Sequence, residues 1–376
     1  MSRMIYADNA ATTKLDMDAF EAMRPYLLDQ YANASQPYSF ARQAKKALQE
    51  SRAQIATCIN ADPEEIYFTS GGTESDNWAI KGSIEYGDHR VVITSEFEHH
   101  AILRACAKIE TLGYPVAYLH PNKDGFITPG NLETTISDQT KLVSIMMVNN
   151  EIGTIQPIKE LCDVAHKHGA VFHTDAVQAL GHIPVDVKAL GVDMMSCSAH
   201  KFNGPKGIGF LFIKKGTMLS AYADGGAQEF GLRAGTENIA AIVGMSVALQ
   251  KNLAHLSDFQ NRLLTLEQTL IDKLNSAEIS FRRNGTEPHV PGNLSLSFPG
   301  IDGEAILHRL DLVGIMVSTG SACDSKNTQI SHVLNAINAD DLYARGTVRI
   351  SLGKDNTVDE ARKIADAIIR IASPKR

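Results

Sequence analysis

The chain has 376 residues, of which 44% are apolar and 21% are charged, and these proportions exclude a disordered, collagen-like or coiled-coil protein. The length is about two and a half times a usual domain of ~150 residues, so we expect two domains. The net charge of −7 argues against a protein that binds nucleic acid or an anionic membrane over a broad surface.

Short apolar runs alternate with segments of helical periodicity along the first two thirds of the chain. The predicted strands are residues 65–70, 90–95, 142–148, 171–174, 193–197 and 208–213, and the predicted helices are residues 76–86, 100–112 and 158–168. Such alternation predicts an α/β fold with a mostly parallel sheet that is covered on both faces. Sheets of this kind bind ligands at the carboxyl ends of their strands.

The pattern changes after a long helical stretch at residues 239–274. The elements expected beyond it are a half-exposed strand at 293–298, a helix at 303–312, a strand at 347–352 and a closing amphipathic helix at 358–371. These elements predict a smaller α+β domain. We place the large domain at residues 14–258, and the small domain at residues 1–13 and 259–376.

Two features bear on location in the cell. The longest apolar stretch, residues 239–249, is too short to cross a bilayer, and residues 1–13 lack the apolar run of a secretory signal. The five cysteines have neither metal-binding nor redox spacing, which indicates reduced thiols. We therefore expect a cytoplasmic protein with no membrane partner.

A glycine-rich turn at residues 198–207 contains Lys201 and follows a predicted strand directly. By position alone Lys201 is either a ligand-binding residue at a strand end or a solvated loop lysine. Asp175 ends the predicted strand before it, where it either faces the same crevice or caps a helix. Together the two residues suggest pyridoxal phosphate, because a lysine can bind this cofactor covalently while an acid keeps its ring nitrogen protonated.

A phosphate site is the third part of this hypothesis. Residues 70–77 follow a strand and open a helix with two glycines, so their N–H groups could hold an anion, although most such turns only connect elements. His99 and His100 begin the next helix. One of them could stack on a flat cofactor and transfer protons, or the two could be a partly exposed pair.

Cys323 differs from the other four cysteines. It lies among small and polar residues, which indicates an exposed loop and a candidate nucleophile, whereas Cys58, Cys106, Cys162 and Cys197 have apolar neighbours and are expected to be inert packing residues. Arg349 alternates with apolar residues in a predicted strand. A buried arginine needs an anionic partner, and a substrate carboxylate could supply one.

These residues occur in motifs that resemble those of one family. The motifs are residues 6–13 (Tyr-Ala-Asp-Asn-Ala-Ala-Thr-Thr), 69–77, 148–153, 198–201, 233–238 and 320–323. In this combination the chain is similar, nearly end to end, to the group I cysteine desulfurases. These are fold-type I pyridoxal-phosphate enzymes of the class V aminotransferase family, with a large, mostly parallel α/β domain and a smaller C-terminal domain.

The resemblance implies a role for each matching residue. Lys201 would hold the cofactor, Asp175 would pair with its ring nitrogen, and His99 would stack on the ring and act as acid–base. Cys323 would take sulfur from L-cysteine as a persulfide and leave L-alanine. The other residues would contact the phenolic oxygen (Gln178), the phosphate (Gly72, Thr73, Ser198, His200, and Thr236 from the partner subunit) and the substrate carboxylate (Asn150 and Arg349).

The resemblance also implies partners. We expect a homodimer that passes sulfur to an acceptor protein, such as an iron–sulfur cluster scaffold or a tRNA-thiolation enzyme, without direct contact with nucleic acid. No resident metal is expected, although a Cys323 persulfide could transiently ligate an iron–sulfur cluster. The alternatives are a selenocysteine lyase or another class V enzyme acting on an amino acid, and a binding module without catalysis.

Two segments depart from the family pattern. Residues 33–41 lack the proline, histidine and glycine of the usual Asn-Pro-Ser-Ser-x-His-x-x-Gly loop. Beyond the cysteine, residues 328–331 read Thr-Gln-Ile-Ser in place of Leu-Glu-Pro-Ser. Both segments are expected near the mouth of the active site.

Overall fold

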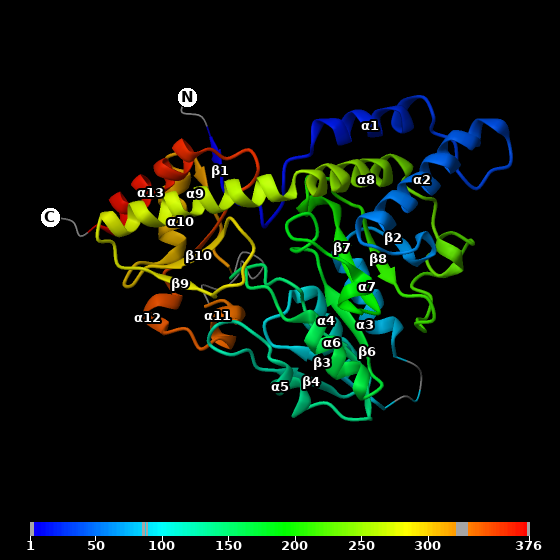
Figure 1. Cartoon of the computed structure of the whole chain (residues 1–376), viewed down its shortest axis with the longest axis horizontal. Coiled ribbons are helices and arrows are strands. Elements are labelled where there is room, and N and C mark those ends of the chain that lie inside the picture. Colours follow the sequence, from blue (N-terminus) through cyan, green and yellow to red (C-terminus); the bar gives the residue numbers. More distant parts are fainter. Residues whose placement is uncertain (1–3, 85–86, 88, 321–329, 374–376) are drawn as a thin grey trace.

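The computed structural model describes residues 4–84, 87, 89–320 and 330–373. Its largest element is a seven-stranded sheet with the order β2-β8-β7-β6-β5-β3-β4 (Figure 1). The strands are β2 (Ile66–Thr69), β3 (Val91–Ser95), β4 (Val116–Leu119), β5 (Thr140–Ser144), β6 (Val171–Asp175), β7 (Met194–Ser198) and β8 (Gly209–Ile213). Strands β7, β6, β5, β3 and β4 are parallel, whereas β8 runs antiparallel to both of its neighbours. The predicted mostly parallel sheet is confirmed.

Successive strand residues divide between two hydrophobic layers, because side chains alternate across a sheet. Val92, Leu142 and Met194 pack with α3 (Gly72–Gly82) and α4 (His100–Glu110) on one face. Their neighbours Ile93, Val143 and Met195 pack into the main core on the other face, with α6 (Ile158–Lys167) and α8 (Ile239–Ala254). Helices α1 (Met17–Leu28) and α2 (Arg42–Cys58) pack along α8.

A second core lies at the C-terminal side of the chain. It is built on the antiparallel sheet β12-β10-β9, which joins β12 (Thr347–Ser351), β10 (Asn293–Ser297) and β9 (Arg282–Asn284). Helices α9 (Leu256–Ser276), α10 (Gly303–Asp311) and α13 (Val358–Ala372) pack on it. The short helices α11 (His332–Ala336) and α12 (Asp341–Ala344) lie below it in Figure 1.

The N-terminal segment joins this second core to the rest of the molecule. Strand β1 (Ile5–Tyr6) pairs in parallel with β11 (Ile315–Met316), and Ile5 and Ala7 are buried in the second core. Our division of the chain at residues 13 and 258 stays a prediction.

Two expectations from the sequence are wrong in detail. The helical stretch 239–274 is two helices, α8 and α9, which are bent by 70° where His255 interrupts them. The strand expected to be half exposed, β10, is buried at all five positions. Its polar face is paired rather than solvated, because Asn284 donates to Ser295 (3.1 Å) and Ser297 (2.8 Å), and Ser297 lies 2.6 Å from the Thr347 hydroxyl.

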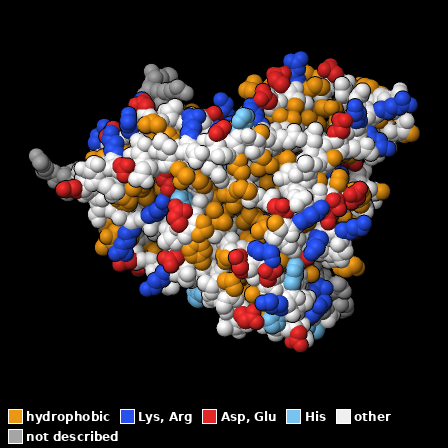
Figure 2. Space-filling model, viewed as in Figure 1, with side chains coloured by type: hydrophobic (Ala, Val, Ile, Leu, Met, Phe, Trp, Pro, Cys, Tyr) orange, Lys and Arg blue, Asp and Glu red, His pale blue; other side chains and the backbone are white. Residues whose placement is uncertain are grey.

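The surface carries charge of both signs. Figure 2 shows Lys and Arg side chains interspersed with Asp and Glu over this face of the molecule, around a hydrophobic band near its centre. Within the described part of the chain no single helix is long and apolar enough to cross a membrane, and α8 and α9 meet that criterion only as a bent pair.

Gly209 allows the closest backbone approach in the large sheet. A Cβ atom at this position would lie 2.3 Å from the carbonyl oxygen of Cys197 and 2.7 Å from the Cα of Gly71. We expect Gly209→Ala to lower the free energy of unfolding by about 2 kcal/mol or more, because the overlap forces backbone shifts. The measurement is urea unfolding of the protein.

Gly130 provides the matched control, since the nearest atom to its Cβ would be the Thr128 hydroxyl at 3.8 Å. Gly130→Ala is expected to leave stability unchanged or to raise it by about 0.5–1 kcal/mol. Equal stabilities for the two variants would contradict the steric argument.

Candidate active site

A cavity of about 570 Å³ lies where the carboxyl ends of the parallel strands meet the second core. Its walls come from the loops after β2, β3, β5, β6 and β7, from residues 8–12, and from Ser318, Gly320 and Arg349. Ten of the twelve predicted site residues line it: Gly72, Thr73, His99, Asn150, Asp175, Gln178, Ser198, His200, Lys201 and Arg349. These ten residues therefore share one cavity, and their individual roles stay predictions.

Two predicted residues are not among the lining residues. Thr236 is described and exposed, which is compatible with a role in a partner subunit's site but does not test it. Cys323 lies outside the described residues. Gly320, three positions before it, lines the cavity.

Lys201 is held at the end of β7 by the N-terminal segment. Its ammonium donates to the carbonyl oxygens of Ala10 (2.5 Å) and Ala11 (3.0 Å). The Gln178 amide donates to the same Ala10 carbonyl at 2.8 Å. One backbone turn thus orients two of the predicted cofactor residues.

Asp175 ends β6, next to β7 in the sheet. Burial raises the pKa of its carboxyl to about 6, against the opposing effects of the Val177 amide, which donates to it at 2.8 Å, and of the nearby Lys201 charge. A carboxylate in such a position would be strongly stabilised by a cationic partner in the cavity. The protonated ring nitrogen of pyridoxal phosphate is a partner of this kind.

A second buried acid, Asp76, lies on α3 beside the cavity. It is 1% exposed, and its Oδ1 has no hydrogen-bond partner within the described part of the chain. Burial and the charge of Asp175 raise its pKa well above the usual value, although Ser196 forms a hydrogen bond with it. Ionising both of two adjacent buried carboxyls costs a large free energy. Because the pKa of Asp76 is raised further than that of Asp175, Asp76 holds the proton and Asp175 carries the charge.

A hydrogen-bond chain supports Asp76 from below. Ser196 lies 2.9 Å from His173 Nε2, and His173 Nδ1 lies 2.8 Å from the Ser144 hydroxyl. Burial lowers the pKa of His173 to about 3, so the ring is neutral. These hydrogen-bonded residues therefore add no charge next to Asp76 and Asp175.

The N-terminus of α3 lies in the cavity wall, at the turn for which the sequence predicts an anion cradle. The first turn of a helix leaves N–H groups without intrahelical partners, and Gly72 and Thr73 begin this turn in the cavity wall. A Cβ atom on Gly72 would lie 2.6 Å from a methyl group of Val177. Glycine is required there because the loops after β2 and β6 meet closely. Ser198 and His200 complete the same wall.

His99 caps α4 and faces the cavity. Its Nδ1 accepts from the Ala101 amide at 3.1 Å, which puts the hydrogen of the neutral ring on Nε2. Burial, followed by the charges of Lys201, His100 and His332, lowers its pKa to about 4. The ring is therefore a neutral hydrogen-bond donor at physiological pH.

Arg349 already has an anionic partner within the chain. Its guanidinium donates to Asp8 Oδ1 at 2.8 Å and to the Asn150 carbonyl at 3.0 Å. Asp8 thus supplies an anionic partner that the sequence did not predict, and the contact of Arg349 with a substrate carboxylate stays a prediction. The Arg349 Nε atom has no partner among the described residues and remains available to an anion.

The other four cysteines behave as packing residues. Cys106, Cys162 and Cys197 are buried and Cys58 is half-buried. Burial raises the pKa of the Cys58 thiol to about 11 and those of Cys106 and Cys162 to about 12. Such thiols are poor nucleophiles.

These residues fit pyridoxal phosphate. The α3 cradle suits its phosphate, Asp175 its ring nitrogen and Lys201 its aldehyde. The unpaired Arg349 Nε and Asp76 Oδ1 show that the cavity has polar groups that a bound molecule can satisfy.

Comparison with known proteins agrees with this assignment. Residues 5–364 match the family described as Aminotransferase class-V. The chain is 44% identical to "Cysteine desulfurase IscS" of Dictyoglomus turgidum, covering 100% of this chain and 96% of the relative. The chain belongs to the cysteine desulfurases of the class V aminotransferase family. Enzymes of this family use pyridoxal phosphate, so the predicted family, fold class and cofactor are confirmed.

Solved structures of this family superpose closely. A structure titled "NIFS-LIKE PROTEIN" has a TM-score of 0.93 at 35% identity, covering 98% of this chain and 99% of that one. A second, "SspA in complex with cysteine", has a TM-score of 0.82 at 36% identity, covering 94% and 100%.

Two acidic residues that line this desulfurase site, and a third beside His99, were not singled out from the sequence. Asp76 could have been noticed as an acid on the apolar side of α3, beside Ala79 and Ile80. Asp8 gave no such signal, since its partner Arg349 lies 341 positions away. Glu98 is fully buried, and burial is the main cause that raises its pKa to about 8. Its position next to His99 in the sequence gave no sign of this burial.

The assignment of proton and charge can be tested by cofactor binding. Asp76→Asn imitates a protonated acid, so we expect the affinity of the apoenzyme for pyridoxal phosphate to change by less than about threefold. Asp175→Asn removes the charged partner of the ring and should weaken binding about 10- to 100-fold. Both affinities are measured by equilibrium titration of the apoenzyme. If Asp76→Asn weakened binding as much as Asp175→Asn, the charge would not reside on Asp175 alone, and the assignment would be wrong.

Proposed function

We propose that this chain is a pyridoxal-phosphate-dependent enzyme that converts L-cysteine to L-alanine and carries the released sulfur as a persulfide on Cys323. The observation that carries the proposal is the convergence of Lys201, Asp175 and the α3 N-terminus on one cavity that also includes Gly320. An extended chain spans at most about 3.5 Å per residue, so three residues keep Cys323 within about 10 Å of Gly320.

Different residues of the cavity would bind the cofactor and the substrate. Lys201 would attach the cofactor, with Asp175 and the N–H groups of α3 fixing its two ends. Arg349 and Asn150 would hold the substrate carboxylate, using the unpaired Arg349 Nε. When bound, the cofactor supplies an electron sink for the bonds at the substrate α-carbon.

Cys323 would carry the sulfur-transfer step. Its thiolate forms an S–S bond with the substrate sulfur while the Cβ–S bond breaks. The electron pair of that bond stays on carbon, which takes up a proton and becomes the methyl group of alanine. His99, as a neutral donor at Nε2, can supply a hydrogen bond to a reacting group in the cavity.

Three further parts of the proposal concern partners. The exposed Thr236 would complete the phosphate site of a second copy, which makes the enzyme a homodimer. The persulfide would pass to an acceptor protein, such as an iron–sulfur cluster scaffold or a tRNA-thiolation enzyme. L-cysteine as the substrate is supported by the structural relative that was solved in complex with cysteine.

Replacement of Cys323 is the decisive test of the reaction. We expect Cys323→Ala to abolish alanine formation from L-cysteine while the visible absorbance of the lysine-bound cofactor stays unchanged. Cys58→Ala, at a half-buried thiol, is the control and should keep the wild-type rate. Wild-type turnover by Cys323→Ala would exclude the persulfide mechanism and favour another class V reaction.

His99→Asn separates catalysis from helix capping, because asparagine is also a good N-cap for α4. We expect cofactor affinity to stay within about tenfold and kcat to fall about 100-fold or more. Because the pKa of His99 is about 4, the wild-type rate should show no His99 titration between pH 6 and pH 8. An unchanged kcat in the variant would remove the ring from the mechanism.

A further inference from the structure

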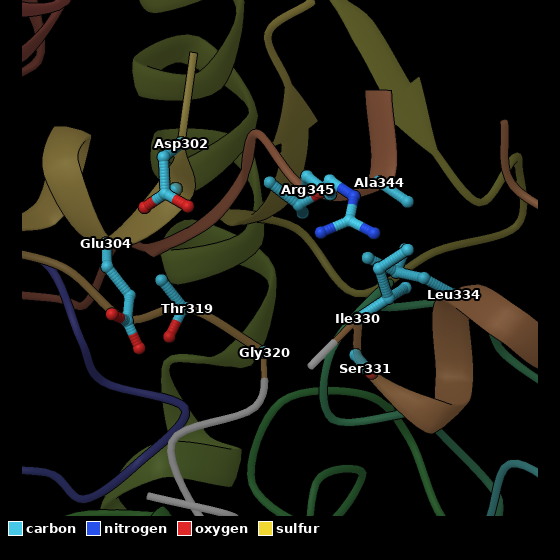
Figure 3. Close-up of a pocket in the computed structure, with 11 residues that line it drawn as sticks. Asp302, Glu304, Thr319, Gly320, Ile330, Ser331, Leu334, Ala344 and Arg345 are labelled. Carbon is cyan, nitrogen blue, oxygen red and sulfur yellow. The ribbon is translucent and has the colours of Figure 1, made fainter. Parts of the chain in front are cut away.

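The segment that carries Cys323 is flanked by Gly320 and Ser331, and both contact one buried carboxylate. The Ser331 hydroxyl donates to Glu151 Oε2 at 2.6 Å. A Cβ atom on Gly320 would lie 2.0 Å from the same oxygen, so the carboxylate rests directly on the Gly320 backbone. Gly320 and Ser331 also lie together at the small cavity of about 50 Å³ in Figure 3.

His332 makes a second contact with the large sheet's loops. Its Nε2 lies 2.9 Å from the Glu98 carbonyl oxygen, which can only accept, so His332 donates. Its ring packs against His100, with ring centroids 4.7 Å apart. His332 is therefore fixed to the loop that carries His99, whereas Ser331 is fixed to Glu151.

The two large-domain loops that receive these contacts are joined to each other. The Asn149 side chain donates to the Phe97 carbonyl (3.0 Å) and accepts from the Glu151 and Ile152 amides (2.9 and 3.1 Å). Glu151 is 4% exposed. Its position therefore depends on the same turn that places Asn150 in the cavity.

The other flank is tied to the substrate-binding strand. Ser318 and Arg349 exchange backbone hydrogen bonds of 3.1 and 2.7 Å, and Arg349 donates to the Asn150 carbonyl. The Ser318 flank is thus anchored to Arg349, and the Ser331 flank to Glu151, the residue after Asn150.

We propose that Glu151, Ser331 and His332 are positioning residues for sulfur transfer, which hold the ends of the Cys323 segment against the loops of His99 and Asn150. Fixing both ends lowers the conformational entropy of the intervening residues, and so raises the effective concentration of the thiol at the substrate. The inference rests on the proposed function, because it assigns these residues to the Cys323 step.

The test compares variants of the cofactor-loaded enzyme. Glu151→Ala, Ser331→Ala and His332→Phe are each expected to lower kcat for alanine formation about tenfold or more, with KM changed less than about threefold. Glu151→Gln keeps an acceptor for the Ser331 hydroxyl and should restore most of the rate. Cofactor absorbance should be unchanged in all four.

A second readout separates positioning from loss of structure. Alkylation of Cys323 by iodoacetamide, followed by mass spectrometry, reports the intrinsic access of the thiol. The rate of alkylation should stay within about twofold of the wild-type rate or rise, while the rate of sulfur transfer from bound substrate falls. Asp340→Ala is the matched control, since Asp340 caps α12 as Ser331 caps α11. It should change neither readout.

Each outcome decides a different claim. Turnover of the Glu151→Ala and Ser331→Ala variants equal to that of Asp340→Ala would overturn the positioning role. Parallel losses of alkylation and turnover would also overturn it, in favour of a merely structural contact. The proposed function itself fails only if Cys323→Ala retains wild-type turnover, so the two failures are distinguishable.

Discussion

The arrangement of the site depends on keeping one negative charge on Asp175 in a buried place. Burial alone raises the pKa of this carboxyl, which would neutralise it and remove its value to a protonated ring nitrogen. Three features act against this: the Val177 amide donates to the carboxylate, Lys201 adds positive charge nearby, and Asp76 takes up the proton that the pair must hold. The neutral His173 beneath them completes this charge balance.

The sequence predicted those parts of the site whose position along the chain reveals their role. Lys201, Asp175 and the Gly72 turn each follow a short apolar strand, so the rule that ligands bind at strand ends brings them together. Asp8 and Asp76 could not be predicted in this way. Their importance arises only when β1 is placed beside β11 and α3 is laid over the sheet, which are tertiary contacts that no local pattern encodes.

The same distinction explains the successes and errors in the fold. Strands β6 and β7 begin with two apolar residues each and were predicted within one residue at each end. Strand β10 looked half exposed because its serines suggested solvent, whereas they pair with Asn284 and Thr347 inside the second core. Helices α1 and α2 were not predicted. Most residues of α2 are polar, and three of its six buried positions are alanines, so its apolar stripe is weak in the sequence.

The N-terminal segment links the position of the second core to the electrostatics of the site. Ala7 is buried in that core, Asp8 pairs with Arg349, and the carbonyls of Ala10 and Ala11 receive the Lys201 ammonium. A shift of the second core would therefore move the partners of both the anion-binding arginine and the cofactor-binding lysine. Because Glu151 contacts both flanks of the Cys323 segment, the same shift would change the position from which the thiol reaches the substrate. In the proposed reaction, binding of the cofactor, binding of the substrate and delivery of the thiol would thus be coupled through a few shared contacts.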